Sequence, residues 1–309
     1  MTATAPAAGL AQPGAPVPAA PERSHRKIGQ RRPRWASKGL VNIVLALFAM
    51  YTLLPLTWLV IASTKSTSDL YGTAGFAFAD INILSNLATL FTWSDGIFLR
   101  WLLNTLLYAG VGAFFSVFVS FMAGYAFDKF DFPGKERWFG FVLVGVLVPA
   151  AVTTMPLYLL ASNVGLVNTY WGVFLPQIAS PFGVYLARIF ANSYVPNELI
   201  EAARLDGAGE LRIFFRVAVP LMSPGIVTLL LMTFSAIWNN FFLPLVMLND
   251  AKLFPVSLGL YSWNQRTLAD PEFASLVVIG SLVAILPVIA LFLSLQRFWK
   301  SGLGSGAIK

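Results

Sequence analysis

Phe273-Ala-Ser-Leu-Val-Val-Ile-Gly-Ser-Leu-Val-Ala-Ile-Leu-Pro-Val-Ile-Ala-Leu-Phe-Leu-Ser-Leu295 is the stretch that decides the class of fold, and it contains no ionisable side chain. A helix rises about 1.5 Å per residue, so it needs about 20 consecutive apolar residues to cross roughly 30 Å of hydrocarbon. This segment is therefore long and apolar enough to span a membrane as a helix.

Five further segments pass the same test, which predicts an all-α membrane protein with six transmembrane helices. They are about Leu40–Ala62, Trp101–Phe127, Trp138–Ala161, Trp171–Leu186 and Leu221–Leu248. The segment Trp171–Leu186 is the shortest, and Pro176 and Pro181 interrupt it.

The composition excludes several classes of protein. Of the 309 residues, 57% are hydrophobic and 11% are charged, whereas a soluble domain carries about 25% charged residues. An ordinary soluble globule and a disordered chain are therefore excluded. The chain has no Cys, and its single histidine, His25, lies in a polar stretch. We expect no disulfide, no metal site and no cofactor.

The distribution of Lys and Arg predicts the orientation, because these residues accumulate on the cytoplasmic side of a membrane protein. With six spans both termini lie on one side. That side would hold 17 of the 21 basic residues, and the other side only Lys65, Arg100, Lys252 and Arg266. Both termini are therefore expected in the cytoplasm. Since the basic charge marks topology and no nucleic-acid-binding fold accompanies it, we expect no nucleic acid partner.

Residues 1–38 are rich in Ala and Pro and then basic, without apolar periodicity. We expect a disordered cytoplasmic tail there and a membrane domain over residues 39–309. The first apolar run, near Leu40, is too long for the core of a signal peptide and is expected to be an uncleaved span.

The six segments contain no Asp, Glu, Lys, Arg or His, and the chain has no GxxxxGK[ST] sequence. Ion-coupled transporters usually carry ionisable groups within the membrane, which these segments lack. Without the GxxxxGK[ST] sequence, the chain is not expected to bind ATP through a P-loop. No paired carboxylate or recognisable nucleophile points to an enzyme. The energy for any transport is thus expected to come from another polypeptide that touches a cytoplasmic loop.

The loop at about residues 192–220 is long and charged, and it predicts two short helices joined at a glycine. Pro196 can begin the first helix, and Gly207 fits the left-handed position just past its end. The expected apolar faces are Leu199, Ile200 and Ala203 in the first helix, and Leu211, Phe214, Phe215 and Ala218 in the second. We call this feature the elbow; it is expected to lie on the membrane surface.

The sequence EAARLDGAGELRIFFRVAVPLMSP at residues 201–224 resembles the EAA loop of permease subunits of ABC importers. The matching residues are Glu201, Ala202, Ala203, Gly207, Val217, Val219 and Pro220, with Val in place of the usual Ile and Leu. The turn Phe132–Lys135, the run Trp238–Phe241 and the C-terminal GLGSGAIK extend the resemblance. Together they are similar to the carbohydrate-uptake family of type I importers, and to its smaller maltose-type permease subunit.

This resemblance implies a type I ABC importer permease fold in a bacterial inner membrane, and a set of partners. These are a second homologous permease, a homodimeric cytoplasmic ATPase, an extracytoplasmic solute-binding protein and a sugar substrate. The residues implied to dock in the ATPase are Glu201, Ala202, Ala203, Arg204, Asp206, Gly207 and Ala208. The tail residues Ser305, Gly306, Ala307, Ile308 and Lys309 are implied to reach into the ATPase dimer.

Two further groups of residues are candidates for contacts with sugar or with the binding protein. Trp238, Asn239 and Asn240, and more weakly Gln177 and Asn104, either form a polar wall of the translocation path or join helices to one another. In the outward loop at about residues 249–272, the resemblance implies that Tyr261, Trp263, Asn264 and Arg266 contact the binding protein, whereas the simpler reading is a cap over the bundle.

Two alternatives to a sugar importer remain at this stage. One is a permease of the same kind for glycerol-phosphate or a polyamine. The other is a stand-alone facilitator, which the uncharged spans would permit. The elbow argues against the facilitator, because such a protein has no use for an ATPase docking site.

Overall fold

The computed structural model describes residues 35–304 and places the side chains of residues 38–295. The expected tail at residues 1–38 lies outside this range except for Trp35–Lys38, and Ser305–Lys309 lie outside it entirely. The chain divides into two compact units, residues 1–51 and 52–309. In the first unit, the described residues form the beginning of helix α1 (Trp35–Ser63), which starts earlier than the expected Leu40.

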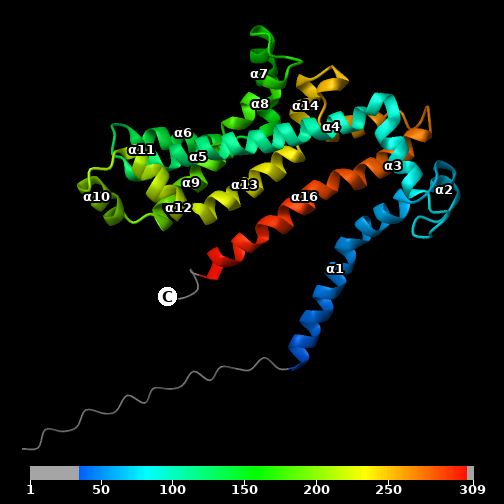
Figure 1. The fold of residues 1–309 in the computed structure, drawn as a ribbon, viewed down its shortest axis with the longest axis horizontal. Coiled ribbons are helices and arrows are strands. Elements are labelled where there is room, and N and C mark those ends of the chain that lie inside the picture. The colour runs from blue at the N-terminus through cyan, green and yellow to red at the C-terminus, as the bar shows by residue number, and fades with distance from the viewer. Residues whose placement is uncertain (1–34, 305–309) are drawn as a thin grey trace, which may run out of the picture. The chain divides into compact units, whose positions relative to one another are not determined.

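The second unit contains the end of α1 and all the other described elements, which are helices (Figure 1). In chain order they are α2 (Thr67–Gly72), α3 (Ile83–Thr92), α4 (Ile97–Leu106), α5 (Gly112–Lys129), α6 (Lys135–Leu147), α7 (Ala150–Asn163), α8 (Tyr170–Ile178), α9 (Pro181–Tyr194), α10 (Asn197–Leu205), α11 (Glu210–Ile213), α12 (Val219–Leu221), α13 (Ser223–Trp238), α14 (Phe242–Met247), α15 (Val256–Asn264) and α16 (Glu272–Gly304). Short 3₁₀ turns occupy Trp93–Gly96 and Ala251–Leu253, and π-helical turns occupy Leu107–Val111 and Phe214–Ala218.

Four helical runs are long and apolar enough to cross a membrane: Lys38–Ser63, Ile83–Lys129, Tyr170–Tyr194 and Glu272–Leu295. Two more pairs of helices pass the test together but are sharply bent. The angle is 104° between α6 and α7, and 79° between the helical run Glu210–Leu221 and α13. The all-α membrane class is confirmed, with up to six spans when each bent pair is counted as one.

Three of the expected spans are broken, one of them at the interruption by proline that the sequence already showed. The span Trp138–Ala161 is interrupted at Val148–Pro149, where Val148 adopts an extended conformation. A proline has no N–H to donate and disfavours the helical conformation in the residue before it. The span Trp171–Leu186 breaks at Ala179–Ser180, just before Pro181, and Leu221–Leu248 breaks at Asn239–Phe241.

The tightest packing joins α5 to α9 (Figure 1). Small residues recur every fourth position on both helices, Ser116, Ser120 and Gly124 on α5 and Gly183, Ala187 and Ala191 on α9. A Cβ atom on Gly124 would lie 2.6 Å from the Cβ of Ala187. Small residues at this spacing let two helix backbones approach closely within a membrane. This pair forms the base on which the elbow sits.

A second apolar cluster lies at the junction of α3, α4, α15 and α16. Leu90, Phe98, Trp101, Trp263 and Leu276 are buried there against one another. The indole of Trp101 also donates a hydrogen bond of 2.7 Å to the carbonyl oxygen of Ala251. The connection between α14 and α15 is therefore fixed to the bundle.

Candidate functional site

The elbow consists of α10 and α11 joined at Gly207, as expected. Gly207 has φ = +78°, the left-handed region that glycine adopts without strain. Its N–H donates to the carbonyl of Arg204, and the N–H of Ala208 donates to the carbonyl of Ala203, both at 3.0 Å. These two bonds form a Schellman motif, which satisfies carbonyls at the end of α10. The angle of the elbow is thus set by its own backbone.

The elbow is anchored to the membrane helices by a buried apolar face. Ile200, Ile213 and Phe214 are buried in one cluster with Phe121 of α5 and Ala191 of α9.

The expected apolar faces of the elbow were wrong at Leu211, Phe215 and Leu199, which are 68%, 49% and 46% exposed; Ile213 lies inside instead. The π-helical turn at Phe214–Ala218 explains the change at Leu211, because it adds a residue to the turn and rotates the preceding side chains.

An ion pair closes the elbow on its outer side. The Nε of Arg204 lies 2.7 Å from Oε1 of Glu210, and its Nη2 lies 3.2 Å from Oε2. This hydrogen bonding raises the pKa of Arg204 above its usual value. Arg204 is thus bound to its own chain, whereas Glu201 and Asp206 form no ion pair among the described residues.

The exposed side of the elbow carries two large apolar residues, one of which, Leu211, was expected to be buried. The side chains of Leu205 and Leu211 are 89% and 68% exposed. They lie on the same short segment as the exposed Glu201, Ala202 and Asp206. We call these five residues the elbow surface. A leucine in an amphipathic helix is ordinarily a core residue, so the exposure of Leu205 and Leu211 could not be predicted from the sequence.

A buried polar cluster ties the start of the elbow to α5. The Nζ of Lys129 donates to the carbonyl oxygen of Val195 at 2.6 Å and to Oδ1 of Asn197 at 2.9 Å. It also lies 2.8 Å from Oδ2 of Asp128, with only 5% and 9% of the two side chains exposed. The amide of Asn192 donates to Asp128. From the sequence, Lys129 contributed only to the prediction of orientation in the membrane. We call this cluster the Lys129 network.

The structure separates the residues that were candidates for a translocation path. Trp238 is buried, and its ring stacks on that of Phe234 at 5.5 Å. Asn104 is buried too: its amide donates to the carbonyls of Lys252 and Phe254, and its Oδ1 accepts from the hydroxyl of Tyr170. Both residues are thus buried within this chain and packed or hydrogen-bonded to its own helices and loops.

The remaining candidates lie in two different hollows. The exposed Asn239 donates its amide to the carbonyl of Ser235 and faces a gap between α13 and α16. Gln177 and Asn240 lie together in another hollow of about 260 Å³ between α7, α8 and α14. The structure thus brings this one amide pair together.

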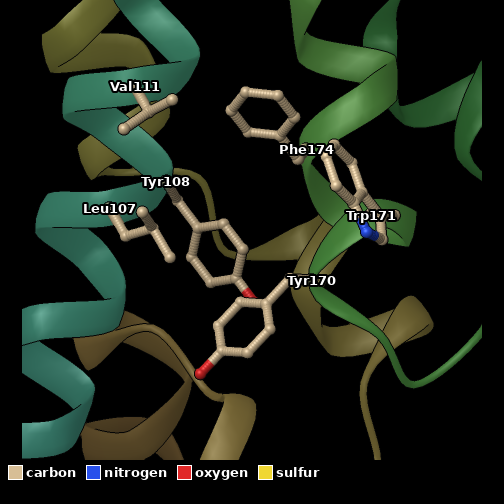
Figure 2. Close-up of a pocket in the computed structure, with 6 residues that line it drawn as sticks. All are labelled: Leu107, Tyr108, Val111, Tyr170, Trp171 and Phe174. Atoms are coloured by element: carbon tan, nitrogen blue, oxygen red, sulfur yellow. The ribbon is translucent and has the colours of Figure 1, made fainter.

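A third hollow of about 310 Å³ has aromatic walls (Figure 2). Figure 2 shows Tyr108 facing Tyr170, with Trp171 and Phe174 on the α8 side. The hydroxyl of Tyr108 donates to the carbonyl of Leu253, and that of Tyr170 donates to Asn104. Both hydroxyl protons are therefore already used within the chain, and only the oxygen lone pairs remain for a ligand.

The candidates for contact with a binding protein also differ in burial. Trp263 is buried, with its ring 4.6 Å from that of Trp101, and cannot be a contact surface. Tyr261, Asn264 and Arg266 are exposed. The guanidinium of Arg266 lies 5.7 Å from the ring of Phe273, which holds it against the surface.

Comparison with known proteins agrees with the fold. The family model for the binding-protein-dependent transport system inner membrane component matches residues 116–303. The arabinooligosaccharides transport system permease protein AraQ of Bacillus subtilis is 34% identical over 87% of this chain and 96% of its own length. The lactose transport system permease protein LacG of Rhizobium radiobacter is 33% identical over 86% and 94%.

A third relative has a different kind of substrate in its name. It is the sn-glycerol-3-phosphate transport system permease protein UgpE of Rhizobium meliloti, 31% identical over 66% of this chain and 72% of its own length. Among solved structures, a bacterial ABC transporter involved in the import of the acidic polysaccharide alginate has a TM-score of 0.74. It is 23% identical and covers 85% of this chain and 97% of its own.

The family match spans more than half of the chain, and the relatives align over nearly its whole length. The bent helices and the elbow occur within the matched region. The chain therefore belongs to the family of inner membrane components of binding-protein-dependent transport systems, the permeases of ABC importers.

Proposed function

We propose that this chain is the translocating permease subunit of a heteromeric importer that carries a di- or oligosaccharide into the bacterial cytoplasm. A separate homodimeric ATPase supplies the energy, and this chain itself performs no catalysis. The names of AraQ and LacG, which refer to arabinooligosaccharides and lactose, support the substrate class.

The observation that carries the proposal is the elbow surface. Leu205 lies outside the apolar spans, so it would meet water in an isolated subunit, and Leu211 is exposed in the first turn of the bent run Glu210–Leu221. Exposed apolar side chains beside charged ones are typical of a surface that a partner covers. Glu201 and Asp206, which have no ion-pair partner among the described residues, add charge for a basic group on that partner. We therefore assign the elbow surface to the ATPase.

The packing of the elbow explains how force would reach the membrane helices. Its inner face is buried against α5 and α9, and the Lys129 network ties its beginning to the end of α5. A well-packed contact resists compression, so a push on the elbow moves its supporting helices with it. Closure of the ATPase dimer would thus turn the permease from its inward-facing to its outward-facing form.

The proposed complex includes two further partners. A second homologous permease would complete the path. An extracytoplasmic solute-binding protein would contact Tyr261, Asn264 and Arg266, which remain exposed. The tail Ser305–Lys309, implied to enter the ATPase dimer, lies outside the described residues.

The hollow lined by Gln177 and Asn240 favours a neutral sugar over glycerol-phosphate or a polyamine. Its lining residues, all of them described, include amides and hydroxyls but no charged side chain. Phosphate recognition generally uses Arg or Lys, and a polyamine would need carboxylates. The name of the relative UgpE, which refers to sn-glycerol-3-phosphate, supports glycerol-phosphate as the alternative substrate. A stand-alone facilitator would leave the elbow surface without a purpose.

The substitution Leu205→Glu tests the proposed docking. The side chain is almost fully exposed, so the change should leave the fold intact but place a charge in the contact. Removing one buried leucine contact costs about 1.5–3 kcal/mol, so we expect at least about a tenfold loss of ATPase affinity. The measurement is co-purification of the ATPase from detergent, together with sugar uptake in cells.

The matched control is Leu268→Glu, the same change at a leucine that is 98% exposed between α15 and α16. This variant should retain the ATPase. If Leu205→Glu holds the ATPase as tightly as Leu268→Glu does and transports normally, the assignment of the elbow surface is wrong.

A further inference from the structure

We propose that the hollow of about 260 Å³ between α7, α8 and α14 is a subsite that binds one ring of the transported saccharide. The inference rests on the proposed function and adds that this subunit itself contacts the sugar. Its main side chains are Gln177, Asn240, Thr153 and Thr154.

All three broken spans meet at this hollow. Ala150 and Ala151 line it just after the break at Val148–Pro149, and Gln177 lines it just before the break at Ala179–Ser180. Asn240 belongs to the break at Asn239–Phe241. Non-helical backbone at membrane depth is stable only where protein buries it or where it lines an aqueous cavity. Three breaks around one hollow therefore indicate a hydrated cavity.

The hydrogen-bonding groups of the hollow are incompletely paired. Nε2 of Gln177 donates to the carbonyl of Val173, but its buried Oε1 has no partner among the described residues. Asn240 accepts one long bond of 3.4 Å from the N–H of Leu243, and no described residue pairs with its amide nitrogen. A buried polar atom without a partner is costly, so a ligand or water is needed there.

The combination of donors and acceptors matches a neutral sugar. The hydroxyls of Thr153 and Thr154 both donate to the carbonyl of Ala150, which leaves their lone pairs as acceptors. With the amide nitrogen of Asn240 as a donor, the hollow can pair with hydroxyl groups, which both donate and accept. Phe242 and Leu157 add apolar wall for the C–H face of a ring.

The size of the hollow limits what it can hold. Pockets for drug-sized ligands occupy about 300–1,000 Å³, and this one is smaller. It would accept a single ring, while the rest of an oligosaccharide would extend towards the second permease. The aromatic hollow of Figure 2 differs in that the protons of both its tyrosine hydroxyls are already bonded within the chain.

Cysteine accessibility tests whether the hollow is hydrated, because the chain has no Cys of its own. In the assembled transporter, we expect Thr153→Cys to react with a charged methanethiosulfonate reagent at least ten times faster than Met155→Cys. Met155 lies two residues further along α7, on its opposite face, and is 61% exposed in the single chain. Equal reaction rates at the two positions would overturn the proposal.

Uptake measurements test the contact with sugar. The probe is the sugar that the wild-type transporter takes up best from labelled lactose, melibiose and arabinotriose. We expect Gln177→Met and Asn240→Leu each to lower its uptake rate about tenfold, the usual effect of losing a hydrogen bond. Stimulation of the ATPase by the loaded binding protein should change less than twofold. The control is Asn163→Leu at the exposed end of α7, which should transport normally.

The outcomes separate this inference from the proposed function. If Leu205→Glu abolishes uptake but Gln177→Met and Asn240→Leu match Asn163→Leu, the importer assignment holds and the subsite is wrong. If either subsite variant fails to assemble, protection of Thr153→Cys from the reagent by the same sugar decides, and absence of protection counts against the subsite. If Leu205→Glu transports normally, the docking assignment fails independently.

Discussion

At the scale of single residues, Gly207 shows how one backbone conformation fixes the elbow. It adopts φ = +78°, and a Cβ atom there would meet no neighbour within 4 Å. Replacement by alanine would therefore act through backbone strain alone, at about 1–2 kcal/mol.

We expect Gly207→Ala to open the elbow more often and to speed trypsin cleavage after Arg204 or Arg212 by about tenfold. Gly209→Ala is the matched control, because Gly209 also has open space around it but a φ of −73°. Equal cleavage rates in the two variants would show that the left-handed turn does not hold the elbow.

Residue-scale prediction from sequence succeeded where a local rule decides the outcome. Gly207 just past a short helix is of this kind, because the rule depends only on neighbours in the chain. Leu211, which was expected to be buried, is exposed because a π-helical turn changed the register, and no residue type in Phe214–Ala218 signals such a turn. The ion pair between Arg204 and Glu210 likewise could not be predicted, because it depends on the angle between the two helices of the elbow.

At the scale of elements, the Lys129 network joins α5 to the connection between α9 and α10. If Lys129 is replaced by methionine, the largely buried carboxylate of Asp128 loses its cation. Breaking a buried ion pair from one side costs about 3–5 kcal/mol. We therefore expect Lys129→Met to lower the melting temperature of the purified transporter by about 6 °C or more.

Lys135→Met is the control for this substitution. Lys135 also pairs with an aspartate, Asp131, but that carboxylate is fully exposed. Such surface pairs contribute about 0–1 kcal/mol, so the melting temperature should change little. The double variant Asp128→Asn/Lys129→Met should recover part of the loss. Equal melting temperatures for Lys129→Met and Lys135→Met would show that the Lys129 network does not stabilise this junction.

The spans show which properties of elements the sequence can predict. The length of the apolar stretches was enough to locate all six segments, because any helix that crosses the hydrocarbon needs about 20 apolar residues, regardless of which helices pack beside it. A helix can break at membrane depth only where the freed backbone groups find partners, which the sequence does not show. Of the breaks at Val148–Pro149 and Asn239–Phe241, only the first is marked in the sequence, by Pro149. The close approach at Gly124 depends on its facing Ala187, more than sixty residues away in the chain.

At the scale of the whole molecule, the orientation in the membrane still rests on the distribution of basic residues. The docking and sugar-binding proposals both require it, since the elbow must face the ATPase in the cytoplasm. The positive-inside rule sets orientation through charges near the ends of spans, and 17 of 21 basic residues fall on the expected cytoplasmic side.

Two single-cysteine variants test this orientation in intact cells, because the chain has no Cys. Leu268 and Leu205 are both highly exposed and lie in loops expected on opposite sides of the membrane. We expect a membrane-impermeant maleimide to label Leu268→Cys in intact cells, and Leu205→Cys only after the membrane is permeabilised. The labelling is done in cells that lack the ATPase, where both side chains are accessible and a difference in labelling reports the side of the membrane. Labelling of Leu205→Cys from outside would place the elbow away from any cytoplasmic ATPase, and the coupling mechanism could not operate.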